Sequence, residues 1–478
     1  MTERKRRRPR AVVLVGGPAD PYSRATRLSR TLVHLGYDVE IAATAVAGAP
    51  PEASDGAVRI RRYPSTGLFG RLRSTYRGGE AAVAVDAGAG GASGATSMPR
   101  RLVRAVRRSA LAWVFWPHTV RGWWHALRHE LAPADLYHAC GVLALPAALA
   151  ARDRDRRAGR SSIVINDVID IVLESNNVLD LPPAFNRLLA RRERRWARSA
   201  DASVAVNDPF ADRAMRRWDL PHRPTVVPNY PERWSPPPQV PDLIRMELGL
   251  PASTRICLFV GRLGPNLGLD EAAEAVLLVP RTVLVLIGFG RGWEASLARD
   301  RDPRYRGRHF TLPARHPDAL ISWVASADIA MVTIPPISYN QRYTTPNKFL
   351  EAIAAGTPIV LGPDLPTMAA ILERERLGEI ARSNAPADIA AAIQSVLDVS
   401  VEDRSAARRR VQDLARDRYS WPTAARAYGE LVRSVSGGRD GSGQSDQVAG
   451  SPSTSSAATR SSASTAGSDG AHSTRTAG

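Results

Sequence analysis

A lysine and a glutamate stand three residues apart in the stretch TTPNKFLEAIAAGTP, residues 344–358. The stretch carries residues typical of helix ends: Thr344 or Thr345 for the N-cap, Pro346 for the first helical position and Gly356 for the C-terminal cap. Lys348 then falls in the first turn and shares one helical face with Asn347 and Glu351. Because the N-terminal end of a helix disfavours a cation, a bound anion best explains a lysine there.

Lysine is also rare in this chain. Lys5 and Lys348 are the two lysines among 65 basic residues, so arginine occupies every other basic position. Lysine presents a compact ammonium, whereas arginine presents a planar fork. We therefore predict that Lys348 binds a phosphate and that Glu351 holds the hydroxyls of a ribose. The alternative is an ordinary surface pair of lysine and glutamate.

Two further loops follow apolar, strand-like runs in the same half of the chain. They are GRLGPNLGLDEAAEA at 261–275, with Gly261, Arg262 and Gly264, and LIGFGRGW at 286–293, with Gly288 and Gly290. Glycines let the backbone approach a ligand, and the carboxyl ends of strands are where α/β sheets bind ligands. Each loop alone is weak evidence, since any tight turn from strand to helix needs glycine. Together with the Lys348 helix, they predict one shared crevice.

The N-terminal half begins with AVVLVGGPADPYSRATRLSRTLVHLGYDVEIAAT, the pattern of a strand, a glycine-containing loop, a helix and a second strand. We expect Gly16, Gly17, Ser23 and Arg24 to face a cleft between domains. Arg24 has two interpretations, a ligand of an acceptor phosphate or a solvated residue at the start of a helix. Asp167 and Asp170, in INDVID, either cap the loop after a strand or contact an acceptor.

Changes in composition along the 478 residues predict the domain boundaries. The expected parts are a basic tail at 1–10, an N-terminal Rossmann-like domain at 11–230, a proline-rich linker at 231–243, a C-terminal Rossmann-like domain at 244–400, helices crossing back at 401–435, and a disordered tail at 436–478. Within the first domain, 65–100 loses all periodicity and is predicted to be a mobile insertion. The predicted fold class is therefore α/β.

The net charge of +18 arises from arginine-rich composition without an accompanying nucleic-acid reading element, so we expect no nucleic-acid partner. No apolar run is long enough to span a membrane, and the short AVVLV run suits a buried strand better than a signal peptide. We expect a cytoplasmic protein. Residues 101–128 mix arginines with tryptophans, which suits either an anionic membrane surface at the inner face of the plasma membrane or packing onto the first domain.

The motifs GRL, IGFG and PNKFLEAIAAGTPIV, in this order after VVPN, resemble the donor-binding half of retaining family 4 glycosyltransferases with the GT-B fold. The resemblance implies two Rossmann-like domains facing across a cleft, a nucleotide-diphosphate sugar as donor, and a glycan or lipid-linked acceptor. It implies that Arg262 and Lys348 neutralise the diphosphate and that Glu351 holds the ribose. It also places Gly288 and Gly290 near the nucleotide, and it implies no cofactor and no metal.

The chain departs from the family pattern at three positions. Leu267 stands where the family often has lysine, Tyr343 where it has a first glutamate, and Ile169 where some members have histidine. Tyr343 is expected to pack near the sugar instead. The departures leave two alternatives open beside a hexosyltransferase: a nucleotide-sugar epimerase on the same fold, or a non-catalytic GT-B-like scaffold at the membrane surface.

Overall fold

The computed structural model describes residues 8–17, 19, 23–46, 48–65, 123–175, 183–237 and 241–437. Apart from a few residues at their edges, the expected basic tail, the insertion at 65–100 and the tail from 436 lie outside these ranges. The same holds for residues 101–122 of the segment with tryptophans and arginines. The described residues up to Ser436 belong to one compact unit.

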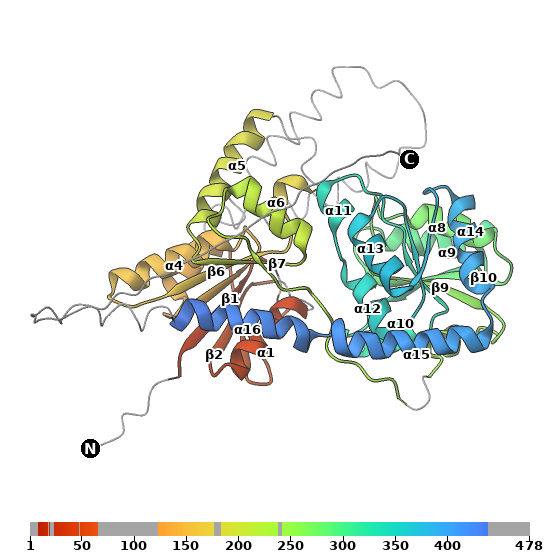
Figure 1. Cartoon of the computed structure of the whole chain (residues 1–478), viewed down its shortest axis with the longest axis horizontal. Coiled ribbons are helices and arrows are strands. Elements are labelled where there is room, and N and C mark those ends of the chain that lie inside the picture. The colour runs from red at the N-terminus through yellow and green to blue at the C-terminus, as the bar shows by residue number, and fades with distance from the viewer. Residues whose placement is uncertain are drawn as a thin grey trace, which may run out of the picture. The chain divides into compact units, whose positions relative to one another are not determined.

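The N-terminal half forms an eight-stranded sheet in the order β3-β4-β2-β1-β5-β6-β7-β8 (Figure 1). Its strands are β1 (Arg10–Val15), β2 (Asp38–Thr44), β3 (Glu52–Asp55), β4 (Val58–Tyr63), β5 (Leu136–Cys140), β6 (Ile163–Val168), β7 (Ala202–Ala205) and β8 (Thr225–Val226). All neighbours pair in parallel except β3 and β4. The central strands are almost completely buried, as expected for parallel strands covered on both faces.

The N-terminal helices cover this sheet. They are α1 (Ser23–His34), α4 (Leu145–Arg157), α5 (Pro183–Arg198) and α6 (Asp208–Trp218), with a 3-10 turn η1 (Val172–Glu174). Helix α6 illustrates how local sequence sets a helix start: the side chain of Asn207 accepts a hydrogen bond from the backbone N–H of Phe210, and Pro209 stands at the second helical position. Residues 123–130 are also helical, and the indole of Trp123 donates to the carbonyl of Ala43.

The C-terminal half forms a fully parallel sheet in the order β11-β10-β9-β12-β13-β14. Its strands are β9 (Arg255–Arg262), β10 (Thr282–Phe289), β11 (His309–Pro313), β12 (Ile329–Val332), β13 (Ile359–Leu361) and β14 (Gly378–Ile380). Its helical elements are α7 (Leu243–Leu248), α8 (Leu269–Leu277), α9 (Trp293–Arg301), η3 (Pro303–Tyr305), α10 (Pro317–Ala325), α11 (Tyr339–Tyr343), α12 (Asn347–Ala355), α13 (Pro366–Glu375), α14 (Pro386–Leu397) and α15 (Val401–Arg418). In a parallel sheet all carboxyl ends meet at one edge, which positions the loops after β9 and β10 beside each other.

The last helix, α16 (Trp421–Gly437), packs on the N-terminal sheet and not on the C-terminal one. Trp421, Tyr428 and Val432 share an apolar cluster with residues of β1 and α1, and Figure 1 shows α16 running alongside α1. The indole of Trp421 donates to the hydroxyl of Thr31 over 3.0 Å. Among the described helices, none has both the length and the apolar composition needed to cross a bilayer.

Candidate active site

Helix α12 begins with an uncapped first turn. The helix starts at Asn347 and not one residue earlier, because Pro346 has the extended backbone of an N-cap, with φ −69° and ψ 156°. No side chain caps the turn, since the hydroxyl of Thr345 lies against the amide of Asn207 at 3.4 Å. The free N–H groups of this turn are therefore available to an anion.

The ammonium of Lys348 lies over the ring of Phe259 on β9, 3.4 Å from its centre. Within the described part of the chain it makes no hydrogen bond and no ion pair. The side chain is partly open to a cavity, but the surrounding protein displaces bulk water, and this burial lowers the pKa of Lys348 to about 7 against the attraction of Glu351. A partly desolvated cation without a hydrogen-bond acceptor or counter-charge in contact is a group that an anionic ligand would stabilise.

Glu351 lies one turn further along the same face of α12. Burial raises the pKa of its carboxyl to about 7, although Arg27 and Lys348 act in the opposite direction. The carboxylate has no hydrogen-bond partner among the described residues. Two neighbouring groups of opposite charge are thus both left without a hydrogen bond or ion pair to any described residue, which is unusual for a structural ion pair.

The loop after β9 leaves room beside the lysine. Gly261 has φ of +120°, a conformation that other residues rarely adopt, and a Cβ there would lie 3.8 Å from Cε of Lys348. On the neighbouring strand, a Cβ at Gly288 would lie 1.9 Å from the carbonyl oxygen of Gly261, so this close approach of β9 and β10 needs glycine. Arg262 follows directly, with an exposed side chain that makes no ion pair or hydrogen bond to any described residue.

These groups line one cavity of about 1010 Å³. Of the predicted residues it contains Gly261, Arg262, Gly288, Asn347, Lys348, Glu351 and Asp170. Asp170 comes from the loop after β6, so residues of both sheets meet here. Its carboxyl is accessible from the cavity, yet the protein around it raises its pKa to about 6, with Arg262 acting in the opposite direction. Of the charged residues predicted from the sequence, the cavity therefore holds three from the C-terminal half and one acid from the N-terminal half.

Arg24 and Asp167 lie outside the cavity, so the structure does not support a direct ligand contact for either. Both are buried, and the guanidinium of Arg24 donates to both oxygens of Asp167 at 2.7 and 2.8 Å and to the carbonyl of Val227. Burial would raise the pKa of Asp167, but Arg24 and His138 outweigh it and hold the pKa at about 2. The pair is part of the scaffold.

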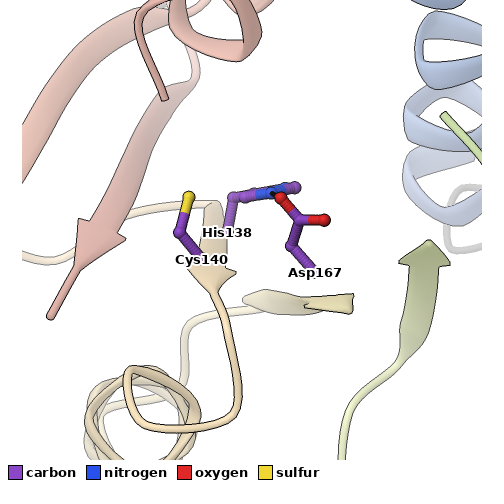
Figure 2. Close-up of side chains that lie close together, drawn as sticks. All are labelled: His138, Cys140 and Asp167. Carbon is purple, nitrogen blue, oxygen red and sulfur yellow. Dashed lines mark hydrogen bonds and ion pairs between the residues drawn. The ribbon is translucent and has the colours of Figure 1, made fainter. Parts of the chain in front are cut away.

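His138 and Cys140 on β5 lie beside Asp167, and together the three could offer ligand atoms to a metal (Figure 2). Their geometry argues for a different role. Nε2 of His138 is 3.3 Å from Asp167, and its Nδ1 is 3.0 Å from the hydroxyl of Tyr428 on α16. Because Arg24 already neutralises Asp167 and both imidazole nitrogens have partners, this cluster fastens α16 to the N-terminal sheet.

Four other predicted positions also lie outside the large cavity. Gly16 and Gly17 follow β1, with the carbonyl of Gly17 accepting from Thr44, and Gly264 lies in the loop after β9. Gly290 lines a smaller neighbouring pocket, where a Cβ would lie 2.7 Å from the carbonyl oxygen of Leu263. These glycines serve the turns that carry the site.

Tyr343 packs against the N-terminal apolar cluster and does not reach the cavity. Its ring lies 4.5 Å from that of Tyr339, and its carbonyl accepts from Asn207 at 2.9 Å. In the same segment, the buried amide of Asn340 forms two hydrogen bonds with the backbone of Ile171, at 3.1 and 3.3 Å. The segment before α12 is thus docked on the N-terminal half, which explains a tyrosine where the family pattern has glutamate.

The N-terminal wall of the cavity is lined by Ser23, Thr26, Arg27 and Arg30 of α1, with Asp55 and Arg62 from β3 and β4. Ser23 was expected at the cleft, but the other five are absent from the sequence-based predictions. The first four have the spacing i, i+3, i+4, i+7, which marks one helical face and could have identified them. Leu267 lines the cavity as well, at the position where the family often has lysine.

Residues 254–399 match the family model described as glycosyl transferases group 1. Among curated proteins, D-inositol 3-phosphate glycosyltransferase from Corynebacterium aurimucosum is 30% identical over 193 residues, which are 38% of this chain and 43% of that protein. The matched region therefore spans less than half of that relative.

Two solved structures are similar over most of the chain. Sucrose-phosphate synthase from Thermosynechococcus elongatus gives a TM-score of 0.61 at 18% identity, covering 90% of this chain and 100% of that one. HepE from Anabaena, in complex with UDP and glucose, gives 0.60 at 14% identity, covering 89% and 100%. At such identities the similarity shows the fold.

The two parallel-sheet α/β domains, with a cavity reached from both, define the GT-B class of structures. Within that fold, residues 254–399 are similar to the glycosyl transferases group 1 family, whose model they match. The predicted fold is thereby confirmed.

Proposed function

We propose that the chain is a glycosyltransferase that moves a hexose from a nucleotide-diphosphate sugar to a glycan or lipid-linked acceptor with retention of anomeric configuration. The observation that carries the proposal is the first turn of α12. There an ammonium and a carboxylate without direct partners face the cavity beside free backbone N–H groups. HepE, whose fold is similar, was solved with UDP and glucose, which supports a donor of this chemical class.

In this mechanism Lys348 and Arg262 bind the diphosphate. When the bond from the sugar to the diphosphate breaks, negative charge grows on the leaving group, and these two cations stabilise it. The N–H groups of α12 add donors at the same place. Arg262 is well suited because its guanidinium makes no ion pair with a described residue and is free to move onto the donor.

Glu351 accepts hydrogen bonds from the ribose hydroxyls, which fixes the donor relative to the cations. Asp170 faces Arg262 from the other half of the chain and accepts a hydrogen bond from the acceptor hydroxyl. With a pKa of about 6, Asp170 is mostly ionised at neutral pH and can take this role.

Calorimetric titration with UDP, GDP and ADP tests the donor site. We expect one nucleotide to bind, and Lys348→Met to weaken its affinity about 10- to 100-fold, since a charge-assisted hydrogen bond contributes about 1.5–3 kcal/mol. Glu351→Gln should weaken binding of the ribonucleotide but leave binding of its 2′,3′-dideoxy analogue unchanged. Glu373→Gln, an exposed acid of α13, is the matched control.

Failure of all three nucleotides to bind would contradict the proposal. The anomeric configuration of the product, read by NMR, tests retention separately, and inversion would overturn that part alone.

A further inference from the structure

Two buried arginines of the N-terminal wall lack acidic partners. Arg27 on α1 and Arg62 on β4 are each 8% exposed, and both line the cavity. Neither forms an ion pair with a described residue, and Nε of each is buried without a hydrogen-bond partner. Leaving two charged groups in this state is costly unless a ligand completes their contacts.

The contacts of Arg27 are neutral. One terminal nitrogen donates to the hydroxyl of Ser23 at 3.2 Å and to the side-chain oxygen of Asn229 at 2.7 Å. Burial lowers the pKa of Arg27 to about 10, and Glu232 and Glu351 only partly offset it from a distance. A guanidinium with spare donors, held by neutral groups at the cavity wall, can bind an oxyanion.

The neighbouring arginines of α1 both have acidic partners, unlike Arg27 and Arg62. Arg30, one turn beyond Arg27 and in the same wall, donates twice to Asp55 at 2.8 and 3.0 Å. Arg24, one turn before Arg27, is neutralised by Asp167. Arg62 donates to the carbonyl of Pro50, which leaves its charge uncompensated.

We propose that this wall is a subsite for an anionic group of the acceptor, in which a phosphate ester binds Arg27 together with the hydroxyls of Ser23 and Thr26, with Arg62 as the second cation. The inference rests on the proposed function, because it assigns the two sides of one cavity to two substrates. The diphosphate of the donor is served by Lys348 and Arg262 from the opposite half.

The hydrogen-bond donors of this wall match a tetrahedral phosphate group. Two guanidinium forks, two hydroxyls and the first turn of the 12-residue helix α1 offer more donors than a planar carboxylate can use. The cavity volume of about 1010 Å³ lies at the upper end for ligand sites, which leaves space for a second ligand beside a nucleotide.

The test uses the full chain saturated with whichever of UDP, GDP and ADP binds most tightly, so that the donor cations are occupied. Inorganic phosphate and glucose 6-phosphate are then titrated, with glucose as the uncharged comparison. We expect phosphate and the hexose phosphate to bind and glucose not to bind. Arg27→Gln should weaken phosphate binding at least 10-fold, Arg62→Gln about 3-fold, and neither should change nucleotide affinity more than twofold.

Arg61→Gln is the matched control, because Arg61 precedes Arg62 on β4 but does not line the cavity. A second arm replaces the hexose phosphate with vesicles of phosphatidylinositol in phosphatidylcholine, against phosphatidylcholine alone. Binding of the hexose phosphate alone identifies a small phosphorylated acceptor, and Arg27-dependent binding to the anionic vesicles alone identifies a lipid headgroup.

Three outcomes would overturn the subsite: no binding of phosphate, hexose phosphate or anionic vesicles, binding unaffected by Arg27→Gln, or equal losses in Arg27→Gln and Arg61→Gln. Nucleotide binding measured in the same samples distinguishes failure of the subsite from failure of the proposed function. If the nucleotide binds and phosphate does not, the subsite fails while the proposed function stands. If no nucleotide binds, the proposed function fails, and phosphate binding that depends on Arg27 but not on Lys348 would still support an anion site in this wall.

Discussion

The two halves of the chain treat their buried charges differently. In the N-terminal half, Arg24 and Asp167 form a bidentate pair that His138 and Tyr428 extend to α16. In the C-terminal half, Lys348 and Glu351 stand three residues apart on one helix, and neither has a direct partner among the described residues.

The difference lies in whether other groups of the protein compensate each charge. A buried charge whose contacts are complete stabilises one arrangement of the backbone, whereas a buried charge without contacts raises the free energy of the empty protein and is relieved by a ligand. By this criterion the N-terminal cluster is scaffold. The α12 pair, together with Arg27 and Arg62 across the cavity, is where ligands are expected.

The largest expected effect is on stability, and it distinguishes the buried pair of Arg24 and Asp167 from Lys348 in the cavity. Asp167→Asn leaves Arg24 buried without a counter-charge and should lower the free energy of unfolding by about 3–5 kcal/mol. Lys348→Met removes a cation that is costly to bury, so it should leave the free energy of unfolding unchanged or slightly higher. Urea unfolding of the two variants, followed by circular dichroism, measures both.

The same experiment has a pH control. Asp167 has a pKa held at about 2, below its value in an unfolded chain, so its contribution to stability is present above pH 4 and is lost as the pH falls towards 2. The wild type and Asp167→Asn should therefore converge in stability as the pH falls through that window. A parallel loss in both variants, or a large loss in Lys348→Met, would break the comparison.

A second expected effect is the uptake of a proton when a nucleotide binds. At pH 8, above the pKa of about 7, most Lys348 side chains in the empty site are neutral, and a bound diphosphate would stabilise the ammonium. Nucleotide binding should therefore take up a proton at pH 8, up to nearly one per site, and much less at pH 6. Titration calorimetry in buffers of different ionisation enthalpy measures the uptake.

In Lys348→Met this uptake should disappear. Equal uptake in the variant and the wild type would assign the proton to another group and would weaken the case for Lys348.

The smallest expected effect lies where the two halves meet. Asn340 in α11 bonds to the backbone of Ile171, next to Asp170, and its own segment leads directly into α12. Asn340→Asp keeps the acceptor oxygen but loses the amide donor. It should lower kcat about 3- to 10-fold while nucleotide affinity changes less than twofold, because each half keeps its own site but their relative placement loosens.

Steady-state kinetics beside nucleotide titration separate the two quantities. An equal loss in affinity and kcat would show that α11 only supports the donor site.

Patterns within single segments predicted much of the fold. The apolar runs at AVVLV, ICLFV and TVLVLI are β1, β9 and β10, because uninterrupted apolar residues bounded by glycine suit buried parallel strands. Strands β4 and β14 were not predicted. β14 has three residues, and β4 reads VRIRRY, whose arginines conceal a strand from any hydrophobic pattern.

Lys348 and Glu351, for which we propose a role in donor binding, were accessible to the sequence for the same reason: they belong to one helix, and helical geometry fixes their shared face. The charge pairing in the N-terminal wall was not accessible. Arg24 and Arg27 are both arginines near the start of α1, and nothing in their local sequence says that Asp167, 143 residues away, neutralises the first and leaves the second. Local spacing determines which side chains share a face of a helix. Only the tertiary structure brings distant charges together, and this pairing decides which charges the protein itself neutralises and which are left for a ligand.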